Sequence, residues 1–177
     1  MISNSVIRLG TQILNWQRSP HLLLSGVTGS SKSSALLLAS LSSMSTKSSL
    51  GEQRGMSAKA YFADGKGALG SVLNKKIVVT PAQLAKLLRI MVENMKARYE
   101  HFSSSFGKDA TEQVDELGRS VRPIIVAIDE LGIFLNDPKT RGEILRYLFQ
   151  LLVGARQASI YVTPQMEIGR ASCRERV

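Results

Sequence analysis

A run of small residues around one lysine is the strongest sign of chemistry in this 177-residue sequence. Residues 26–33 read Gly-Val-Thr-Gly-Ser-Ser-Lys-Ser, between an apolar stretch at 21–26 and a leucine-rich stretch at 32–44. Small residues allow successive backbone N–H groups to converge on phosphate oxygens, and the start of a helix adds a favourable dipole. The segment is therefore a candidate phosphate-binding loop, in the strand–loop–helix setting that such a loop requires.

The positions of this loop have different expected roles. Lys32 would reach the β- and γ-phosphates of a nucleoside triphosphate, and the Ser33 hydroxyl would ligate Mg²⁺. The other candidate nucleotide-binding residues are Gly26, Val27, Thr28, Gly29, Ser30, Ser31 and Ser34. The alternative is a Ser/Gly-rich loop before an Ala/Leu-rich helix, with no ligand.

One position departs from the expected pattern. The motif GxxxxGK[ST] has glycine directly before its lysine, and this chain has Ser31 there. If the backbone needs a positive φ at that position, a Cβ costs on the order of 1 kcal/mol. The departure therefore leaves open a domain that binds nucleotide weakly, or one that binds it without hydrolysis.

A second element of the candidate site lies about 100 residues further along the chain. Residues 124–128 are a short apolar run typical of a buried strand, and Asp129 and Glu130 follow it directly. Asp129 would hold Mg²⁺ through water, opposite Ser33, and Glu130 would act as general base on the attacking water. Acidic turns after strands are common, so this pair alone is a weak signal. Together with the candidate phosphate-binding loop that precedes it in the chain, it indicates a nucleotide site. In an open α/β sheet both motifs lie at the carboxyl ends of strands, where ligands bind.

A polar residue also follows the next apolar run. Residues 160–162 are β-branched or aromatic and continue into Thr163-Pro164-Gln165. Gln165 is a candidate catalytic residue that would sense the γ-phosphate. The alternative is a plain exit from a strand into a loop.

The elements that must position these residues alternate between short apolar runs and amphipathic stretches. Strands are predicted at 21–26, 60–63, 76–80, 124–128 and 160–162, and helices at 32–44, 81–102 and 138–156. Residues 1–18 are a strand pair or a lead-in. This alternation predicts an α/β fold with a mostly parallel sheet.

Composition and charge narrow the class of protein. The hydrophobic share of 44% and the charged share of 21% are typical of a globular domain. No apolar run approaches the roughly 18 residues of a membrane-spanning helix, and a single Cys excludes a disulfide-built fold. The net charge of +9 favours a polyanionic partner such as nucleic acid. We expect a cytoplasmic protein.

The last eleven residues differ from the rest of the chain. Residues 167–177, EIGRASCRERV, have no apolar period and hold the only Cys. The string resembles the in-frame translation of a short-read sequencing adapter, and a genuine basic tail is the alternative. We therefore expect a native domain at 1–166, with 20 basic and 12 acidic residues and a charge of +8, followed by a non-native tail at 167–177.

Five features, in order between residues 7 and 165, resemble the FtsK/SpoIIIE family of double-stranded DNA translocases, especially the FtsK-like ATPases of Gram-positive mobile elements. They are PHLLLSGVTGSSKS at 20–33, Asp64-Gly65-Lys66 in place of the family's Asp-Pro-Lys, a helical segment ending in Met95-Lys96-Ala97-Arg98-Tyr99, IIVAIDELGIFL at 124–135, and GARQASIYVTPQ at 154–165.

The resemblance implies a RecA-like P-loop NTPase core that uses ATP and Mg²⁺. It also implies a homo-oligomeric ring that moves double-stranded DNA through non-specific backbone contacts, in segregation or conjugative transfer. Arg156 matches a helix arginine of the family, which makes it a candidate for a γ-phosphate or intersubunit contact.

The same resemblance implies parts outside this sequence: a last core strand, a winged helix, and for some members an N-terminal membrane anchor. We therefore expect the fragment itself to be inactive. Two alternatives remain: a type IV secretion coupling ATPase, which shares the loop and the acidic strand, and a non-hydrolysing nucleotide- or DNA-binding module, suggested by Ser31.

Overall fold

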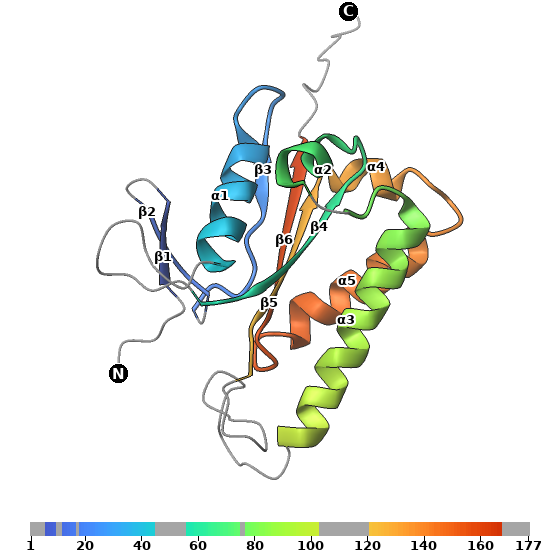
Figure 1. Ribbon diagram of the computed structural model, residues 1–177. Coiled ribbons are helices and arrows are strands. Elements are labelled where there is room, and N and C mark those ends of the chain that lie inside the picture. The colour runs from blue at the N-terminus through green and yellow to red at the C-terminus, as the bar shows by residue number, and fades with distance from the viewer. Residues whose placement is uncertain are drawn as a thin grey trace, which may run out of the picture.

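The centre of the molecule is a four-stranded parallel sheet with the strand order β3-β6-β5-β4 (Figure 1). The strands are β3 (Leu24–Gly26), β4 (Lys59–Asp64), β5 (Ile124–Asp129) and β6 (Ile160–Glu167). The computed structural model describes residues 6–9, 12–16, 18–44, 56–74, 77–102 and 121–167, and structural statements concern these residues. The predicted α/β fold with a mostly parallel sheet is confirmed.

The strand order decides which residues meet at the carboxyl edge of the sheet. β6 is inserted between β3 and β5, so Gly26 pairs with Glu167 while Asp64 pairs with Asp129. Because all four strands run in the same direction, the loops that follow β3, β4 and β5 open at one edge. The phosphate-loop strand and the acidic strand are therefore neighbours of the same central strand.

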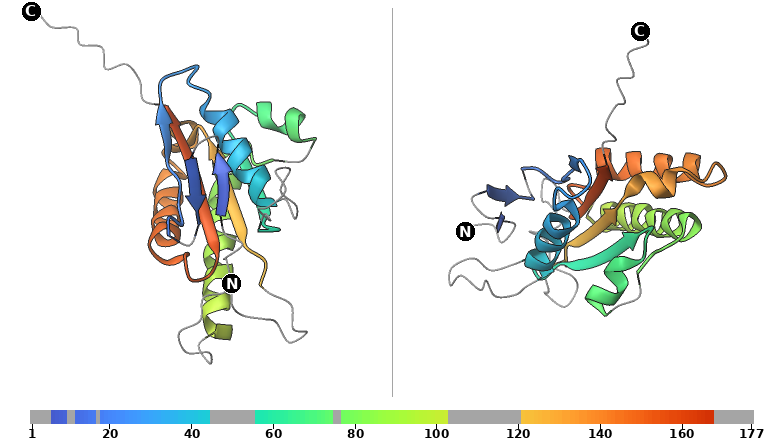
Figure 2. Two further views of the ribbon diagram at one scale, coloured as in Figure 1. Left: turned by 90° about the vertical axis from the view of Figure 1, so that its left-hand side faces the viewer. Right: turned by 90° about the horizontal axis from the view of Figure 1, so that it is seen from above.

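Helices cover both faces of the sheet (Figure 2). On one face lies α1, and on the other lie α3 and α5, which pack against each other. The short helices α2 and α4 follow β4 and β5 at the carboxyl edge. The helix bounds are α1 (Lys32–Met44), α2 (Ala68–Leu73), α3 (Pro81–Phe102), α4 (Leu131–Leu135) and α5 (Arg141–Gly154). Among the described residues, no helix is long and apolar enough to cross a membrane.

The larger core lies between the sheet and the α3/α5 pair. Steps of three and four residues place the apolar side chains of each helix on one face, which is the face that packs on β5 and β6. The fully or nearly fully buried members include Leu84, Leu88, Met91, Val126, Ile128, Ile144, Leu148, Leu151 and Val162. This packing makes the central strands rigid supports for the residues at their carboxyl ends.

The opposite face is closed by α1 and an N-terminal hairpin. β1 (Val6–Leu9) and β2 (Gln12–Asn15) pair antiparallel, which confirms a strand pair in the first 18 residues. Directly after the hairpin, Trp16 is fully buried, and its ring stacks on Tyr161 with 5.3 Å between centroids. Its Nε1–H donates to Ser43 Oγ at 3.0 Å, which ties the hairpin to α1.

The strand predicted at 76–80 is wrong. Val78 forms only an isolated parallel bridge to Ala63, and Thr80 is already the cap of α3. The Gln83 N–H donates to Thr80 Oγ1 and the Thr80 N–H to Gln83 Oε1, each at 3.3 Å, which is a reciprocal helix cap. Because the N–H groups of Val79 and Thr80 donate to Gln83, they are not available to pair with a neighbouring strand.

The segment from Met95 to Tyr99 has a structural role at the amino edge of the sheet. Arg98 donates to the Ala158 carbonyl at 2.5 Å and to the Arg122 carbonyl at 2.9 Å, and Tyr99 donates to the Gly154 carbonyl. These contacts join the end of α3 to the entrances of β5 and β6. The Arg-Tyr pair that the sequence singled out therefore orders the strand entrances, far from the phosphate loop.

Candidate functional site

The loop between β3 and α1 forms one wall of a pocket at the carboxyl edge of the sheet. The pocket has a volume of ≈ 260 Å³. Its lining residues are Thr28, Gly29, Ser30, Ser31, Lys32, Ser33, Ser34, Glu130, Gln165 and Glu167. The structure thus brings together the three segments that the sequence predicted as parts of one site.

The backbone of this loop takes a left-handed conformation at two positions. Gly29 has φ 79°, which glycine adopts without strain. Ser31 has φ 55°, a conformation that costs a residue with a Cβ about 1–2 kcal/mol. The departure from the glycine pattern therefore falls on a position where the backbone does need a positive φ.

Lys32 is the first residue of α1, and its side chain bends back across the loop. Its Nζ donates to the Val27 carbonyl at 2.7 Å and lies 3.4 Å from Ser30 Oγ. The ammonium therefore lies over the loop whose backbone N–H groups would surround a phosphate. This is the placement expected of a lysine that contacts the β- and γ-phosphates.

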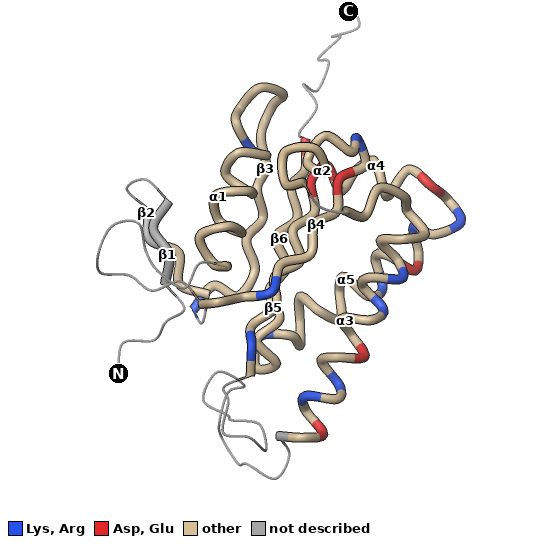
Figure 3. Tube along the Cα trace, in the orientation of Figure 1, with Lys and Arg blue, Asp and Glu red and all other residues tan. Residues whose placement is uncertain are grey.

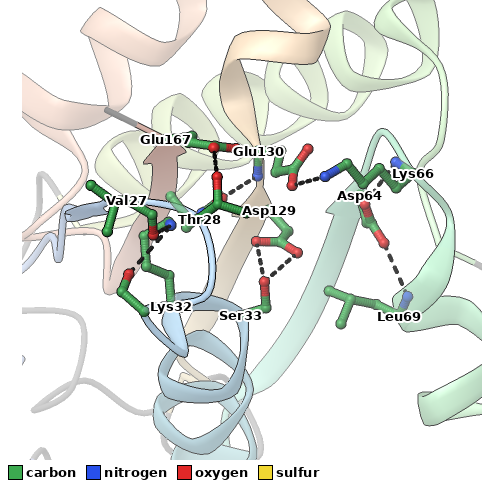
Figure 4. A network of polar contacts seen from close by, with 12 residues as sticks. Val27, Thr28, Lys32, Ser33, Asp64, Lys66, Leu69, Asp129, Glu130 and Glu167 are labelled. Carbon is green, nitrogen blue, oxygen red and sulfur yellow. Dashed lines mark hydrogen bonds and ion pairs between the residues drawn. The ribbon is translucent and has the colours of Figure 1, made fainter. Parts of the chain in front are cut away.

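Ser33 and Asp129 meet as the metal prediction requires (Figure 4). The Ser33 hydroxyl, in the first turn of α1, lies 3.0 and 2.9 Å from the two carboxylate oxygens of Asp129 at the end of β5. Asp129 is 6% exposed. This burial raises the pKa of its carboxyl group, with smaller contributions from the nearby Asp64 and Glu130, while the hydrogen bond from Ser33 opposes the shift.

These two residues fit Mg²⁺. The ion prefers hard oxygen ligands and keeps several waters, so one hydroxyl and one carboxylate beside a phosphate are a sufficient donor set. A buried carboxylate whose charge is unfavourable also gains from a nearby cation. Within the described ranges there is no group of three or more His, Cys, Asp or Glu that could hold a metal ion.

Glu130 and Gln165 are linked through the backbone. The Gln165 side chain is 2% exposed, and its Oε1 accepts the Glu130 N–H at 2.5 Å. Glu130 itself is left-handed, with φ 50°, at the turn between β5 and α4. The residue predicted to sense the γ-phosphate is therefore hydrogen-bonded to the residue predicted to be the general base.

Three acidic or basic residues of the site were missed by the sequence reasoning. Lys66, in the turn after β4, forms an ion pair with Glu130, and the carboxylate of Asp64 accepts the backbone N–H groups of that turn. Glu167, expected in a non-native tail, is the last residue of β6, and Thr28 donates to its carboxylate. Figure 3 shows acidic positions gathered at the carboxyl ends of the strands. The available signal was that Asp64-Gly65-Lys66 also follows a predicted strand.

Arg156 does not lie at this pocket. It is exposed in the turn between α5 and β6, which places it at the amino edge of the sheet, opposite the phosphate loop. A contact with the phosphate of its own subunit is therefore excluded by distance along β6. An intersubunit role for Arg156 stays a prediction, and residues 168–177 lie outside the described part of the chain.

No protein-family model matches this chain. The chain is 28% identical over 167 residues to the FtsK domain-containing protein YdcQ of Bacillus subtilis (strain 168). The match covers 90% of this chain and 32% of YdcQ, so the chain spans about a third of that relative's length. The predicted resemblance to FtsK-domain proteins is confirmed.

Two solved structures among those with the same fold are a conjugation coupling protein and a pair of ATPase domains. The pCW3 conjugation coupling protein TcpA, solved with ATPγS, has a TM-score of 0.76 and 24% identity, covering 94% of this chain and 49% of TcpA. EssC (ATPases 2 and 3) of Geobacillus thermodenitrificans has a TM-score of 0.66 and 16% identity, covering 89% of this chain and 30% of EssC. The chain therefore shares the α/β fold of these proteins, with a parallel sheet and a loop of the same kind between its first sheet strand and α1.

Proposed function

We propose that this chain is the motor domain of an ATP-dependent translocase that moves double-stranded DNA, in segregation or conjugative transfer. The observation that carries the proposal is the contact between Ser33 and Asp129, with Lys32, Glu130 and Gln165 around the same pocket. The resemblance of the sequence motifs to the FtsK/SpoIIIE family of DNA translocases supports DNA as the substrate, and the similarity to the FtsK domain-containing protein YdcQ and to the conjugation coupling protein TcpA agrees with it. The net charge of +9 suits a partner with a phosphate backbone.

In this proposal each residue acts on the triphosphate end of ATP. Lys32 and the loop N–H groups bind the phosphates, and Ser33 and Asp129 would hold Mg²⁺, which neutralises phosphate charge when bound. Glu130 accepts a proton from water as the water oxygen bonds to the γ-phosphorus and the bond to the bridging oxygen breaks. Gln165 reports the state of the γ-phosphate to Glu130 through their hydrogen bond.

The pocket accounts for the phosphate chain rather than for a whole nucleotide. Its ≈ 260 Å³ lies below the range of about 300–1,000 Å³ typical of small-molecule sites. We infer that a neighbouring subunit completes the site in a homo-oligomeric ring in the cytoplasm. A type IV secretion coupling ATPase, the alternative enzyme, shares the phosphate loop and the acidic strand, and the sequence that flanks this domain would distinguish it from the translocase.

A second candidate function is a nucleotide-binding module that does not hydrolyse ATP. The observation that favours it is the left-handed Ser31, since strain in the loop can misplace the phosphate relative to Glu130. A complete gene product with Ser31 that binds Mg·ATP tightly and shows no turnover with or without DNA would establish this alternative.

The decisive test separates binding from turnover. Calorimetric titration of the 177-residue chain with Mg·ATP should show binding, lost in Lys32→Ala and retained in Lys139→Ala, an exposed lysine remote from the pocket. In the complete gene product, Glu130→Gln should keep ATP binding and lower DNA-stimulated phosphate release by about 10²–10⁴-fold, the usual contribution of a general base. Unchanged turnover in Glu130→Gln would refute its role.

A further inference from the structure

The carboxylate of Glu130 is engaged by a residue that lies outside the phosphate pocket. Lys66 Nζ forms an ion pair with Glu130 Oε1, yet Lys66 is not among the described residues that line the pocket. Figure 4 shows the Glu130 side chain directed toward Lys66 and away from Lys32. The proposed general base therefore has its charge held on the side of the site that faces away from the phosphate loop.

The position of Lys66 is fixed by its own turn. The buried carboxylate of Asp64 accepts the Lys66 N–H at 2.8 Å and the Leu69 N–H at 3.0 Å. Gly65 lies directly against α4, where an added Cβ would come within 2.6 Å of Ile133 Cγ2. The turn after β4 is thus built close to the residues that follow Glu130, which brings the ammonium within reach of its carboxylate.

Glu130 is restrained at two independent points. Gln165 holds its backbone N–H, and Lys66 holds its side chain. The Glu130 side chain is 18% exposed, whereas that of Lys66 is 58% exposed, so the ammonium reaches the pair from the solvent side. The hydrogen bond with Glu130 is the main cause that raises the pKa of the Lys66 ammonium, as expected for a cation that gains an anionic partner.

We propose that Lys66 is a positioning residue that holds the Glu130 carboxylate away from the attacking water, and that this ion pair opens before hydrolysis. The inference rests on the proposed function, because it concerns the base of that reaction. Opening needs only rotation of the Glu130 side chain, since its backbone remains bonded to Gln165. The Lys66–Glu130 pair therefore acts as a latch on basal turnover.

The test is steady-state ATP turnover of the complete gene product without DNA. Lys66→Met should raise this basal rate about two- to fivefold, the range expected when an exposed ion pair is removed. The dissociation constant for Mg·ATP should stay within about twofold, because Lys66 does not touch the described pocket. Lys66→Arg should retain the wild-type rate, and the matched control Lys139→Met should change neither quantity.

Two further measurements test the latch without relying on the folding of Lys66→Met alone. Raising the salt concentration screens an exposed pair, so the basal rate of the wild type should approach that of Lys66→Met at about 0.5 M KCl. The double variant Lys66→Met/Glu130→Gln should be as inactive as Glu130→Gln. A basal rate that is unchanged or lower in Lys66→Met, at wild-type ATP affinity, would overturn the latch.

The experiments distinguish a failure of the Lys66 latch from a failure of the proposed function. If Glu130→Gln abolishes turnover but Lys66→Met does not raise it, Lys66 is no latch and the proposed function stands. If Glu130→Gln leaves turnover unchanged, the proposed function itself fails.

Discussion

Replacing Ser31 with glycine should stabilise the domain without tightening ATP binding. The left-handed backbone at Ser31, φ 55°, costs a residue with a Cβ about 1–2 kcal/mol. Glycine removes this cost but increases the conformational freedom of the unfolded chain, which returns about 0.4–1 kcal/mol. The net gain is roughly 0.5–1 kcal/mol, or about 1–4 °C in Tm for a chain of this size.

The absence of an affinity effect follows from where the strain occurs. We expect Ser31 to keep this positive φ in both the free and the ATP-bound loop, so the unfavourable backbone energy belongs to folding and cancels from the free energy of ATP binding. The dissociation constant for Mg·ATP should therefore change by less than about twofold, a difference of ~0.4 kcal/mol.

The assay combines thermal unfolding with calorimetric ATP titration of the 177-residue chain. Ser42→Gly is the matched control, because Ser42 lies inside α1, where glycine costs about 0.5 kcal/mol relative to serine. Its Tm should fall while that of Ser31→Gly rises. A fall in Tm for Ser31→Gly would mean that the left-handed backbone costs Ser31 no free energy in the folded state. A tenfold tighter ATP affinity would mean that the loop becomes left-handed only on binding.

Two other predictions test the supports of the site. His21 Nδ1 accepts the Val162 N–H at 3.1 Å, and burial lowers the pKa of its ring below the usual 6.5, so the folded state favours the neutral form. The free energy of unfolding, measured with urea, should therefore decrease as the pH falls below 6.5. His21→Asn should reduce this pH dependence, and an equal slope in His21→Asn and the wild type would contradict the prediction. Gly65→Ala should destabilise the domain by about 1–3 kcal/mol, because the added Cβ would clash with Ile133. Gly132→Ala is the control, since no atom lies within 4 Å of its added Cβ. Equal Tm values in the two variants would show that the contact with Ile133 does not limit stability.

Local patterns of the sequence predicted most of the fold. The helix over 32–44 agrees with α1 residue for residue, because its leucines and alanines repeat at helical spacing and a phosphate-loop pattern precedes it. The start of α3 at Pro81 also follows from a local rule, since proline fits the first turn of a helix. The strand expected at 76–80 did not form, although its β-branched residues favour a strand. Val78 makes only a single bridge to Ala63, and Thr80 caps α3 instead of continuing a strand.

For the candidate site too, some features could be predicted from local sequence and others could not. The residue types and spacing of Lys32, Ser33 and Asp129 determined what chemistry they could do, because phosphate and Mg²⁺ require these groups next to a glycine-rich turn. The order of the strands in the sheet could not be predicted from local sequence. Only the tertiary structure inserted β6 between β3 and β5, which brought Gln165 onto the backbone of Glu130 and Glu167 beside Thr28.

From the sequence we could predict a candidate phosphate-binding loop, an acidic strand end and an α/β architecture, since each depends on residues close together in the chain. The tertiary structure alone decided that Lys66 pairs with Glu130 across 64 positions. It also showed that Ser31 occupies a left-handed position. An ion pair between strand ends depends on which strands become neighbours, and a backbone angle depends on how the ends of the loop are anchored. Both are consequences of packing along the whole chain.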